Sequence, residues 1–297
     1  MTSRHKTLAE ITAHVAGTYE LPGEAVFPES IGVDAATGDA YVGSLADGTL
    51  YKLTAGGKAE LWGAGGQDGR GSVAGVKVDD RGRLWAAGGY DGTLHVYDLR
   101  TRELLARLAT GAQPSLVNDI AFGPRGDAYV TDSLVPAMFV VRDELAALER
   151  WADLAAGGVP WPAGLNFNGL VLTADRRSLV ACQTNLGRFW RIDLASREVG
   201  EVALAGGPLE HCDGLAISGS TLYVAVNARN LVAVVDLADD GSAGRVIRLL
   251  RSDAFAFPTA VAVSGRRLLV VNGQLDQMGG QPRLPFTVAV VAIPETW

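Results

Sequence analysis

Cysteine is almost absent from this chain of 297 residues, which contains only Cys182 and Cys212. Two isolated cysteines neither build a disulfide framework nor provide the paired spacing of a zinc site. We expect both to be buried thiols without a chemical role. The cysteine content therefore gives no reason to place the protein in an oxidising compartment.

Basic runs and long apolar runs are also missing. The chain carries 26 Lys and Arg against 33 Asp and Glu, a formal net charge of −7, and no run of five basic residues. Nucleic acids and anionic membranes bind basic surfaces, so we expect neither as a partner. No stretch reaches the roughly 18 apolar residues of a membrane span, and the N-terminal MTSRHKTLAEITAHVAG lacks the apolar core of a secretory signal. We expect a cytoplasmic protein that acts on a small molecule.

Six segments of the chain repeat one pattern, in which a polar or small residue precedes an apolar strand, a polar turn and a second apolar strand. Two copies are NDIAFGPRGDAYVTD (118–132) and DGLAISGSTLYVAVN (213–227). The copies begin 44 to 50 residues apart, at Glu29, Ala74, Asn118, Asn168, Asp213 and Thr259. Further strand-like segments follow each pair, so each repeat holds about four short strands.

Four short strands in a period of about 45 residues are typical of one blade of a β-propeller. The sequence therefore predicts an all-β, six-bladed β-propeller with four antiparallel strands per blade, forming a single domain over residues 1–297. No repeat ends in Trp-Asp, which disfavours the WD-repeat class. The last repeat has only three evident strands, and we predict that residues 10–21 supply the fourth and close the ring. The alternative is a free N-terminal arm.

The residue that begins the innermost strand of a blade lies at one rim of the central channel. We therefore expect Glu29, Asn168 and Asp213 to meet around the axis. Clustered carboxylates repel one another unless a proton or a cation lies between them. Carboxylate and amide oxygens without a thiolate suit a hard divalent cation, and few protein ligands would leave positions open for water or substrate. The alternative is that these side chains cap turns and bind channel water.

The repeats resemble the regucalcin/gluconolactonase family of six-bladed propellers over most of the chain. Four motifs carry the resemblance: PESIGVD around Glu29, VNDIAF around Asn118, NFNGLVLTAD around Asn168 and HCDGLAI around Asp213. The resemblance implies that Glu29, Asn168 and Asp213 hold one divalent ion, Ca²⁺ first, with Zn²⁺, Mn²⁺ or Mg²⁺ as alternatives. It also implies that Asn118 contacts the substrate or completes the coordination.

The chemistry that this resemblance implies is the hydrolysis of a lactone. A bound ion would polarise the carbonyl and stabilise the oxyanion while water attacks with the help of a base. Asp213 is the candidate for that base in the family. His211 is a second candidate, particular to this chain, because histidine titrates near neutrality. The alternative for His211 is an ordinary loop residue.

One position departs from the family pattern. Members that act on sugar lactones tend to carry an arginine two residues before the asparagine that Asn118 matches, and here that residue is Leu116. Phe27, Trp161 and Phe167 are candidates for the walls of a more apolar pocket, unless they pack between blades.

We therefore expect a metal-dependent hydrolase of a lactone or related ester other than a simple sugar lactone. Two alternatives remain. One is a non-hydrolytic enzyme, such as a cyclase, isomerase or condensing enzyme, that uses the same axial pocket. The other is a non-catalytic binding or scaffold propeller.

Overall fold

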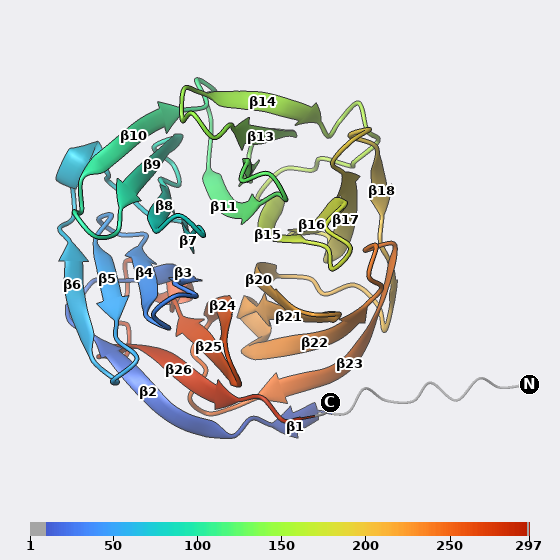
Figure 1. Ribbon diagram of the computed structural model, residues 1–297. Coiled ribbons are helices and arrows are strands. Elements are labelled where there is room, and N and C mark those ends of the chain that lie inside the picture. Colours follow the sequence, from blue (N-terminus) through green and yellow to red (C-terminus); the bar gives the residue numbers. More distant parts are fainter. Residues whose placement is uncertain (1–9, 296) are drawn as a thin grey trace, which may run out of the picture.

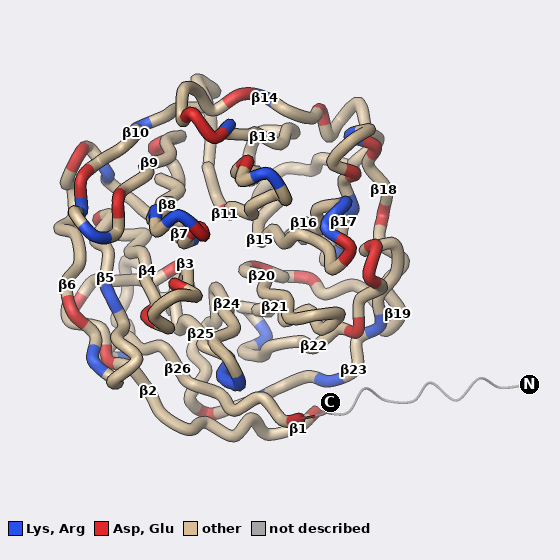
Figure 2. The backbone as a smooth tube through the Cα atoms, in the orientation of Figure 1, with Lys and Arg blue, Asp and Glu red and all other residues tan. Residues whose placement is uncertain are grey.

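The computed structural model describes residues 10–295 and 297, which form a ring of six β-sheets around a central axis (Figure 1). The six-bladed propeller predicted from the repeats is confirmed. Each blade has four antiparallel strands, with the first at the axis and the fourth at the rim. Figure 2 shows the charged residues mostly on the outer strands and the turns.

The strands follow the repeats in chain order. Blade 1 consists of β3 (Pro28–Val33), β4 (Ala40–Ser44), β5 (Leu50–Leu53) and β6 (Ala59–Gly63). Blade 2 consists of β7 (Gly75–Val78), β8 (Arg83–Ala87), β9 (Thr93–Asp98) and β10 (Leu104–Ala109). Blade 3 consists of β11 (Val117–Phe122), β12 (Ala128–Asp132), β13 (Ala137–Val141) and β14 (Leu148–Asp153).

The second half of the ring repeats the same order. Blade 4 consists of β15 (Phe167–Leu172), β16 (Ser178–Gln183), β17 (Arg188–Asp193) and β18 (Val199–Glu201). Blade 5 consists of β20 (Cys212–Ser218), β21 (Thr221–Val226), β22 (Leu231–Leu237) and β23 (Ala243–Arg251). Blade 6 takes β24 (Pro258–Ser264), β25 (Arg267–Asn272) and β26 (Phe286–Ala292) from the C-terminal end of the chain.

Three 3₁₀ turns complete the regular structure of the described residues: η1 (Gln67–Gly69), η2 (Asn227–Arg229) and η3 (Leu275–Gln277). In this part of the chain no helix has the length and apolar character needed to cross a bilayer.

The N-terminal segment closes the ring, as predicted. Strand β2 (Val15–Leu21) pairs antiparallel with β26 and becomes the outermost strand of blade 6. The shorter β1 (Glu10–Thr12) continues onto blade 5, where it pairs in parallel with one end of β23. Strand β19 (Ala203–Ala205) pairs in parallel with the other end. Both additions cover sheet edge that would otherwise be open to pairing with another chain.

The hydrophobic core lies between the blades. Among the described residues the buried apolar side chains form six clusters, one at each junction of neighbouring blades. At the junction of blades 1 and 2, for example, the ring of Trp62 on β6 meets that of Tyr97 on β9 edge to face at 5.7 Å. Because each sheet is apolar on both faces, it can only be stable with a neighbour on either side, which requires a closed ring.

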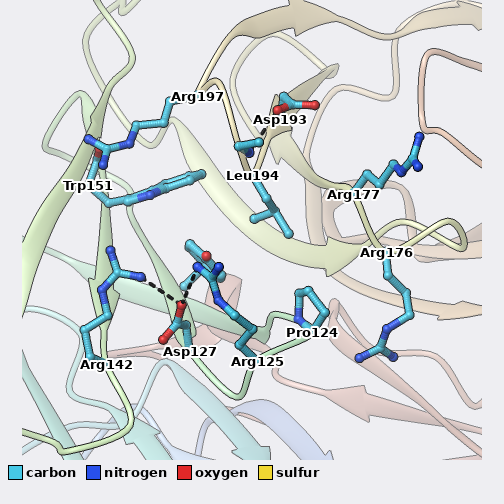
Figure 3. A pocket seen from close by; sticks show the side chains of 12 residues that line it. Pro124, Arg125, Asp127, Arg142, Trp151, Arg176, Arg177, Asp193, Leu194 and Arg197 are labelled. Atoms are coloured by element: carbon cyan, nitrogen blue, oxygen red, sulfur yellow. Dashed lines mark hydrogen bonds and ion pairs between the residues drawn. The ribbon is translucent and has the colours of Figure 1, made fainter.

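An arginine–tryptophan contact repeats at the rim. Arg197, in the turn between β17 and β18, lies over the Trp151 ring of blade 3 with its guanidinium carbon 6.0 Å from the ring centre, and it donates to the Trp151 carbonyl at 3.1 Å (Figure 3). Arg102 has the same relation to Trp62, at 5.7 Å and 3.2 Å. Both arginines adopt left-handed φ values, 64° and 63°. The turn conformation thus directs each arginine onto the preceding blade.

The arginine–tryptophan contact of blades 3 and 4 borders a surface groove of about 690 Å³ (Figure 3). Two of the arginines that line it contact the protein itself, since Arg142 pairs with Asp127 at 2.8 Å and Arg197 covers Trp151. The groove lies at the turns between strands, away from the residues that the sequence singled out.

Candidate functional site

The predicted residues occupy equivalent places on the innermost strands. Five of them are the second residue of such a strand: Glu29 on β3, Asn118 on β11, Asn168 on β15, Asp213 on β20 and Thr259 on β24. The sixth, Ala74, directly precedes β7. The repeat phase read from the sequence is therefore correct to within one residue in every blade.

The pairing between the first two strands of a blade is irregular at these places. In β20 the register against β21 shifts between Cys212 and Leu215, which puts Asp213 inside a β-bulge. The same shift occurs at the start of β3, β11, β15 and β24. A bulge takes a side chain out of the regular alternation and gives it a new direction. Strand β7 pairs without a register shift, and its site residue is Ala74.

Small residues let the innermost strands of neighbouring blades come close together. A Cβ atom on Gly169 would lie 2.4 Å from the carbonyl oxygen of Asp213, and one on Gly75 would lie 1.9 Å from that of Asn118. Both distances are far shorter than any real contact, so these places accept only glycine. The close approach is what brings side chains from different blades to one axial site.

Asp213 is the most unusual group of this site. Its side chain is buried, and Oδ2 accepts a hydrogen bond from Nδ2 of Asn227 at 3.0 Å. Oδ1 is buried as well and has no hydrogen-bond partner. Burial raises the pKa of Asp213 to about 7, against the lowering effect of the Asn227 and Asn168 amides and with a further increase from the charge of Asp119. A carboxyl group in this state can bind a proton or a cation near neutral pH.

Glu29 is part of the same electrostatic cluster. Its side chain is buried, and this burial is the main reason why its pKa lies well above the ordinary value. The negative charges of Asp213 and Asp119 raise the pKa further, while the Lys77 ammonium lowers it. Three carboxyl groups from blades 1, 3 and 5 therefore interact across the axis.

The two predicted asparagines are held in place by blade 3. Nδ2 of Asn118 donates to Oγ of Ser133 at 2.9 Å, and this hydroxyl donates in turn to the carbonyl of Phe167 at 2.6 Å. The backbone carbonyl oxygen of Asn168 accepts a hydrogen bond from the Thr131 hydroxyl at 2.8 Å. The side-chain amide of Asn118 and the backbone of Asn168 are thus fixed at the junction of blades 3 and 4.

Two charged residues of the site were missed in the sequence. Asp119 follows Asn118 on β11, and its Oδ1 lies 2.7 Å from Nζ of Lys77 on β7. The other oxygen, Oδ2, accepts the backbone N–H of Leu170 on β15 at 2.9 Å. The signal that could have revealed them is the alignment of the repeats, because the positions of Asp119 and Lys77 hold small or apolar residues in the other copies.

The channel changes character along its length. The beginnings of the innermost strands carry the polar groups described above, whereas their ends line a cavity of about 270 Å³. Its walls include Val33, Phe122, Leu172 and Ile217, all apolar, and Lys77 is its charged member. Lys77 and its partner Asp119 therefore connect the apolar part of the channel to the carboxylate cluster.

The remaining candidates are three aromatic side chains and one histidine. Phe27 and Phe167 are buried, in contact with Phe286 at 4.9 Å and with Trp161 at 5.6 Å between ring centres. Trp161 is partly exposed, so of the three predicted pocket walls it is the one that a ligand can reach. His211 is exposed on the loop before β20, with a left-handed φ of 65°.

The predicted ligands offer the oxygen atoms that a divalent cation prefers, but only two of them are carboxylates. Within residues 10–295 and 297, no three side chains of His, Cys, Asp or Glu are gathered closely enough to hold a metal ion. The predicted set is of a different composition, since it joins the carboxylates of Glu29 and Asp213 to the amide of Asn168. The buried, unpartnered Oδ1 of Asp213 is the feature that fits such an ion.

Solved structures confirm the fold type. Regucalcin of Agrobacterium tumefaciens, described as a calcium-binding protein, is similar at a TM-score of 0.65 and 17% sequence identity, over 94% of this chain and 97% of that one. Virginiamycin B lyase of Staphylococcus aureus is similar at 0.63 and 11%, over 94% and 99%. The allergen Mala s 1 of Malassezia sympodialis reaches 0.71 and 14%, over 92% and 95%.

Sequence comparison adds nothing to this likeness, since no protein-family model and no curated protein matches the chain. The three structural relatives include a lyase and an allergen as well as a calcium-binding protein. At identities this low the likeness establishes the fold alone.

Proposed function

We propose that this protein is a metal-dependent hydrolase of the regucalcin/gluconolactonase type, which opens a lactone or related ester other than a simple sugar lactone. The observation that supports this most directly is the buried Oδ1 of Asp213, which has no partner although it lies among other oxygen-bearing side chains. A buried carboxylate oxygen without a donor is strongly unfavourable unless a proton or a cation satisfies it.

Glu29, Asn168 and Asp213 would hold one divalent ion, with Ca²⁺ as the first candidate because all three offer hard oxygen donors. When bound, such an ion supplies polarisation of the ester carbonyl and stabilisation of the oxyanion. The hydrogen bond from Asn227 occupies Oδ2 of Asp213 and leaves Oδ1 as the atom that would face the ion. The family resemblance makes Asp213 the candidate for the base as well. In the metal-free protein the pKa of Asp213 is about 7, and a bound cation would lower it and keep the carboxylate ionised.

The substrate would be positioned by Asn118, whose amide is held by Ser133. Leu116, where sugar-lactone members tend to have arginine, is buried and offers no donor to a sugar hydroxyl. The apolar cavity beyond the carboxylates also favours a substrate with an apolar substituent.

A second candidate function is a non-hydrolytic reaction in the same pocket. It is favoured by the similarity to virginiamycin B lyase, a propeller whose name denotes bond cleavage by elimination. The same channel would then bind a substrate whose bond is broken without the addition of water.

Both candidates are tested by incubating the purified protein, loaded with Ca²⁺, Zn²⁺ or Mn²⁺, with a panel of aliphatic, aromatic and sugar lactones. Hydrolysis adds one water to the product mass, whereas elimination or isomerisation leaves the mass unchanged. Asp213→Ala should abolish metal binding and turnover, and Asp236→Asn, on an exposed part of β22, should preserve both. Turnover that survives complete chelation would contradict the metal-dependent mechanism.

A further inference from the structure

Lys77 occupies a repeat position at which every other blade has a small or apolar residue. It is the fourth inner-strand residue counted from the site position, and the other blades have small or apolar residues there: Gly32, Ala121, Val171, Ala216 and Ala262. Asp119 is equally exceptional one residue after the site position, where the other blades have Ser30, Gly75, Gly169, Gly214 and Ala260. The two exceptions stand on neighbouring blades and contact each other at 2.7 Å.

The Lys77–Asp119 pair is largely shielded from solvent, and a further hydrogen bond holds its carboxylate in place. The Lys77 side chain is 22% exposed and that of Asp119 only 5%. Asp119 is also held by the N–H of Leu170, so that one carboxylate joins the inner strands of blades 2, 3 and 4. A partly buried pair of this kind is screened by water and salt much less than an exposed one.

The charge of Lys77 acts on the site residues beyond Asp119. Strand β7 lies between β3, which carries Glu29, and β11, which carries Asp119. The Lys77 ammonium favours the ionised form of Glu29 and lowers the pKa of that carboxyl group. The Lys77 ammonium thus pairs with Asp119 and also acts on Glu29, and the charge of Asp119 acts in turn on Asp213.

We propose that Lys77 is a built-in counter-cation of the axial carboxylates, which sets how tightly this site binds a divalent metal ion. This inference rests on the proposed metal site and concerns its regulation by a residue that is not a ligand. The positive charge of Lys77 stabilises the ionised carboxylates when no metal ion is bound. The same charge repels a divalent metal ion that enters the channel. The site would therefore bind divalent ions more weakly than it would without the ammonium group of Lys77.

The test measures the affinity for Ca²⁺ and Mn²⁺ by calorimetry in three variants of the full chain. Lys77→Met keeps the apolar stem and removes the charge, and it should tighten binding roughly tenfold or more. Asp119→Asn keeps the acceptor for Leu170 but leaves the ammonium unpaired, and it should weaken binding by a similar factor. The double variant restores the original charge balance and should bind within about threefold of the unchanged protein.

The opposite signs are what distinguish this role from a merely structural one. Both single variants lose the same contact, so damage to the fold would shift their metal affinities in the same direction. Lys52→Met is the matched control, because Lys52 pairs with Asp39 at 2.8 Å at a similar exposure of 26% but away from the axis; its affinity should remain unchanged. If Lys77→Met is too unstable to purify, the Asp119→Asn and double variants alone decide the matter.

The outcomes separate this inference from the proposed function. Metal binding by the unchanged protein that Lys77→Met does not tighten would overturn the counter-cation role and leave the metal site intact. Absence of binding in every folded variant would overturn both.

Discussion

Asn227 donates its Nδ2 hydrogen to Oδ2 of Asp213 at 3.0 Å, while Oδ1 of the same carboxylate is buried without a partner. Both residues belong to blade 5, where Asp213 stands near the start of β20 and Asn227 follows β21. The blade therefore satisfies half of the carboxylate locally and leaves the other half facing the axis. Without a bound cation, the buried and unpartnered oxygen of Asp213 lowers the stability of the folded protein.

Asp213→Asn should stabilise the metal-free protein while it removes metal binding. At pH 8 in the presence of a chelator, we expect the variant to gain about 1 to 3 kcal/mol in unfolding free energy, since it replaces a buried charge by a neutral amide. Urea denaturation with and without Ca²⁺ measures both effects. Asp236→Asn, at an exposed position, should change neither. A variant that is less stable than the unchanged protein under chelation would contradict the assignment.

Gly169 should tolerate no side chain. Alanine would place its Cβ 2.4 Å from the backbone oxygen of Asp213 and 2.7 Å from the backbone nitrogen of Leu215, so blades 4 and 5 would have to separate. We expect Gly169→Ala to lose about 2 kcal/mol or more of stability and to weaken metal binding. Gly200→Ala in β18 of the same blade is the control, because nothing lies within 4 Å of its Cβ. Equal stability of the two variants would refute the close approach.

His95 should make the protein less stable in mild acid. The side chain is buried on β9, its Nδ1 has no partner, and burial lowers its pKa from 6.5 to about 4. Between these two pH values the unfolded chain binds the proton and the folded chain does not. Stability should therefore be fully present above about pH 6.5 and fall by up to about 3 kcal/mol as the pH drops to 4.

Urea titrations at several pH values test the role of His95. His95→Phe, which can retain the stacking on Tyr97, should show a flatter dependence of unfolding free energy on pH between 6.5 and 4. Replacing the exposed His14 by Gln should leave that dependence as it was. An unchanged slope in His95→Phe would show that other groups control acid stability.

The N-terminal strands should be essential for solubility. Deletion of residues 1–21 removes β2, which exposes the edge of β26 and part of the buried cluster that contains Tyr19 and Leu21. We expect the truncated protein to aggregate or to melt at a clearly lower temperature, as followed by light scattering and calorimetry. Glu10→Ala removes only an exposed ion pair with Arg251 and should leave the melting curve unchanged. An unchanged melting curve after the deletion would contradict ring closure by β2.

The propeller architecture was predictable because it depends on a pattern of apolar and turn residues within each repeat. Each repeat shows its own alternation of apolar residues and its own turns, so the number of blades follows from a period of about 45 residues. The same phase places Glu29, Asn168 and Asp213 on equivalent strands. Their burial near one axis then follows from the geometry of any propeller.

Other features of the site depend on which residue of one blade faces the next. The β-bulges that redirect Asp213 and its counterparts arise from the pairing of two strands and leave no clear mark in the residues themselves. The burial of Phe27 and Phe167, which the sequence offered equally as pocket walls or packing, was decided by the junctions between blades.

The sequence by itself determined the six repeats, the closing strand and the residues that begin the innermost strands, because apolar periodicity and turn residues act over a few neighbours along the chain. Only the tertiary structure decided that Asp119 and Lys77 join the carboxylate cluster, that Asn227 occupies one oxygen of Asp213, and that the other oxygen stays free. These relationships arise where separate strands approach within a few ångströms, and charge and hydrogen bonding act through that distance in space.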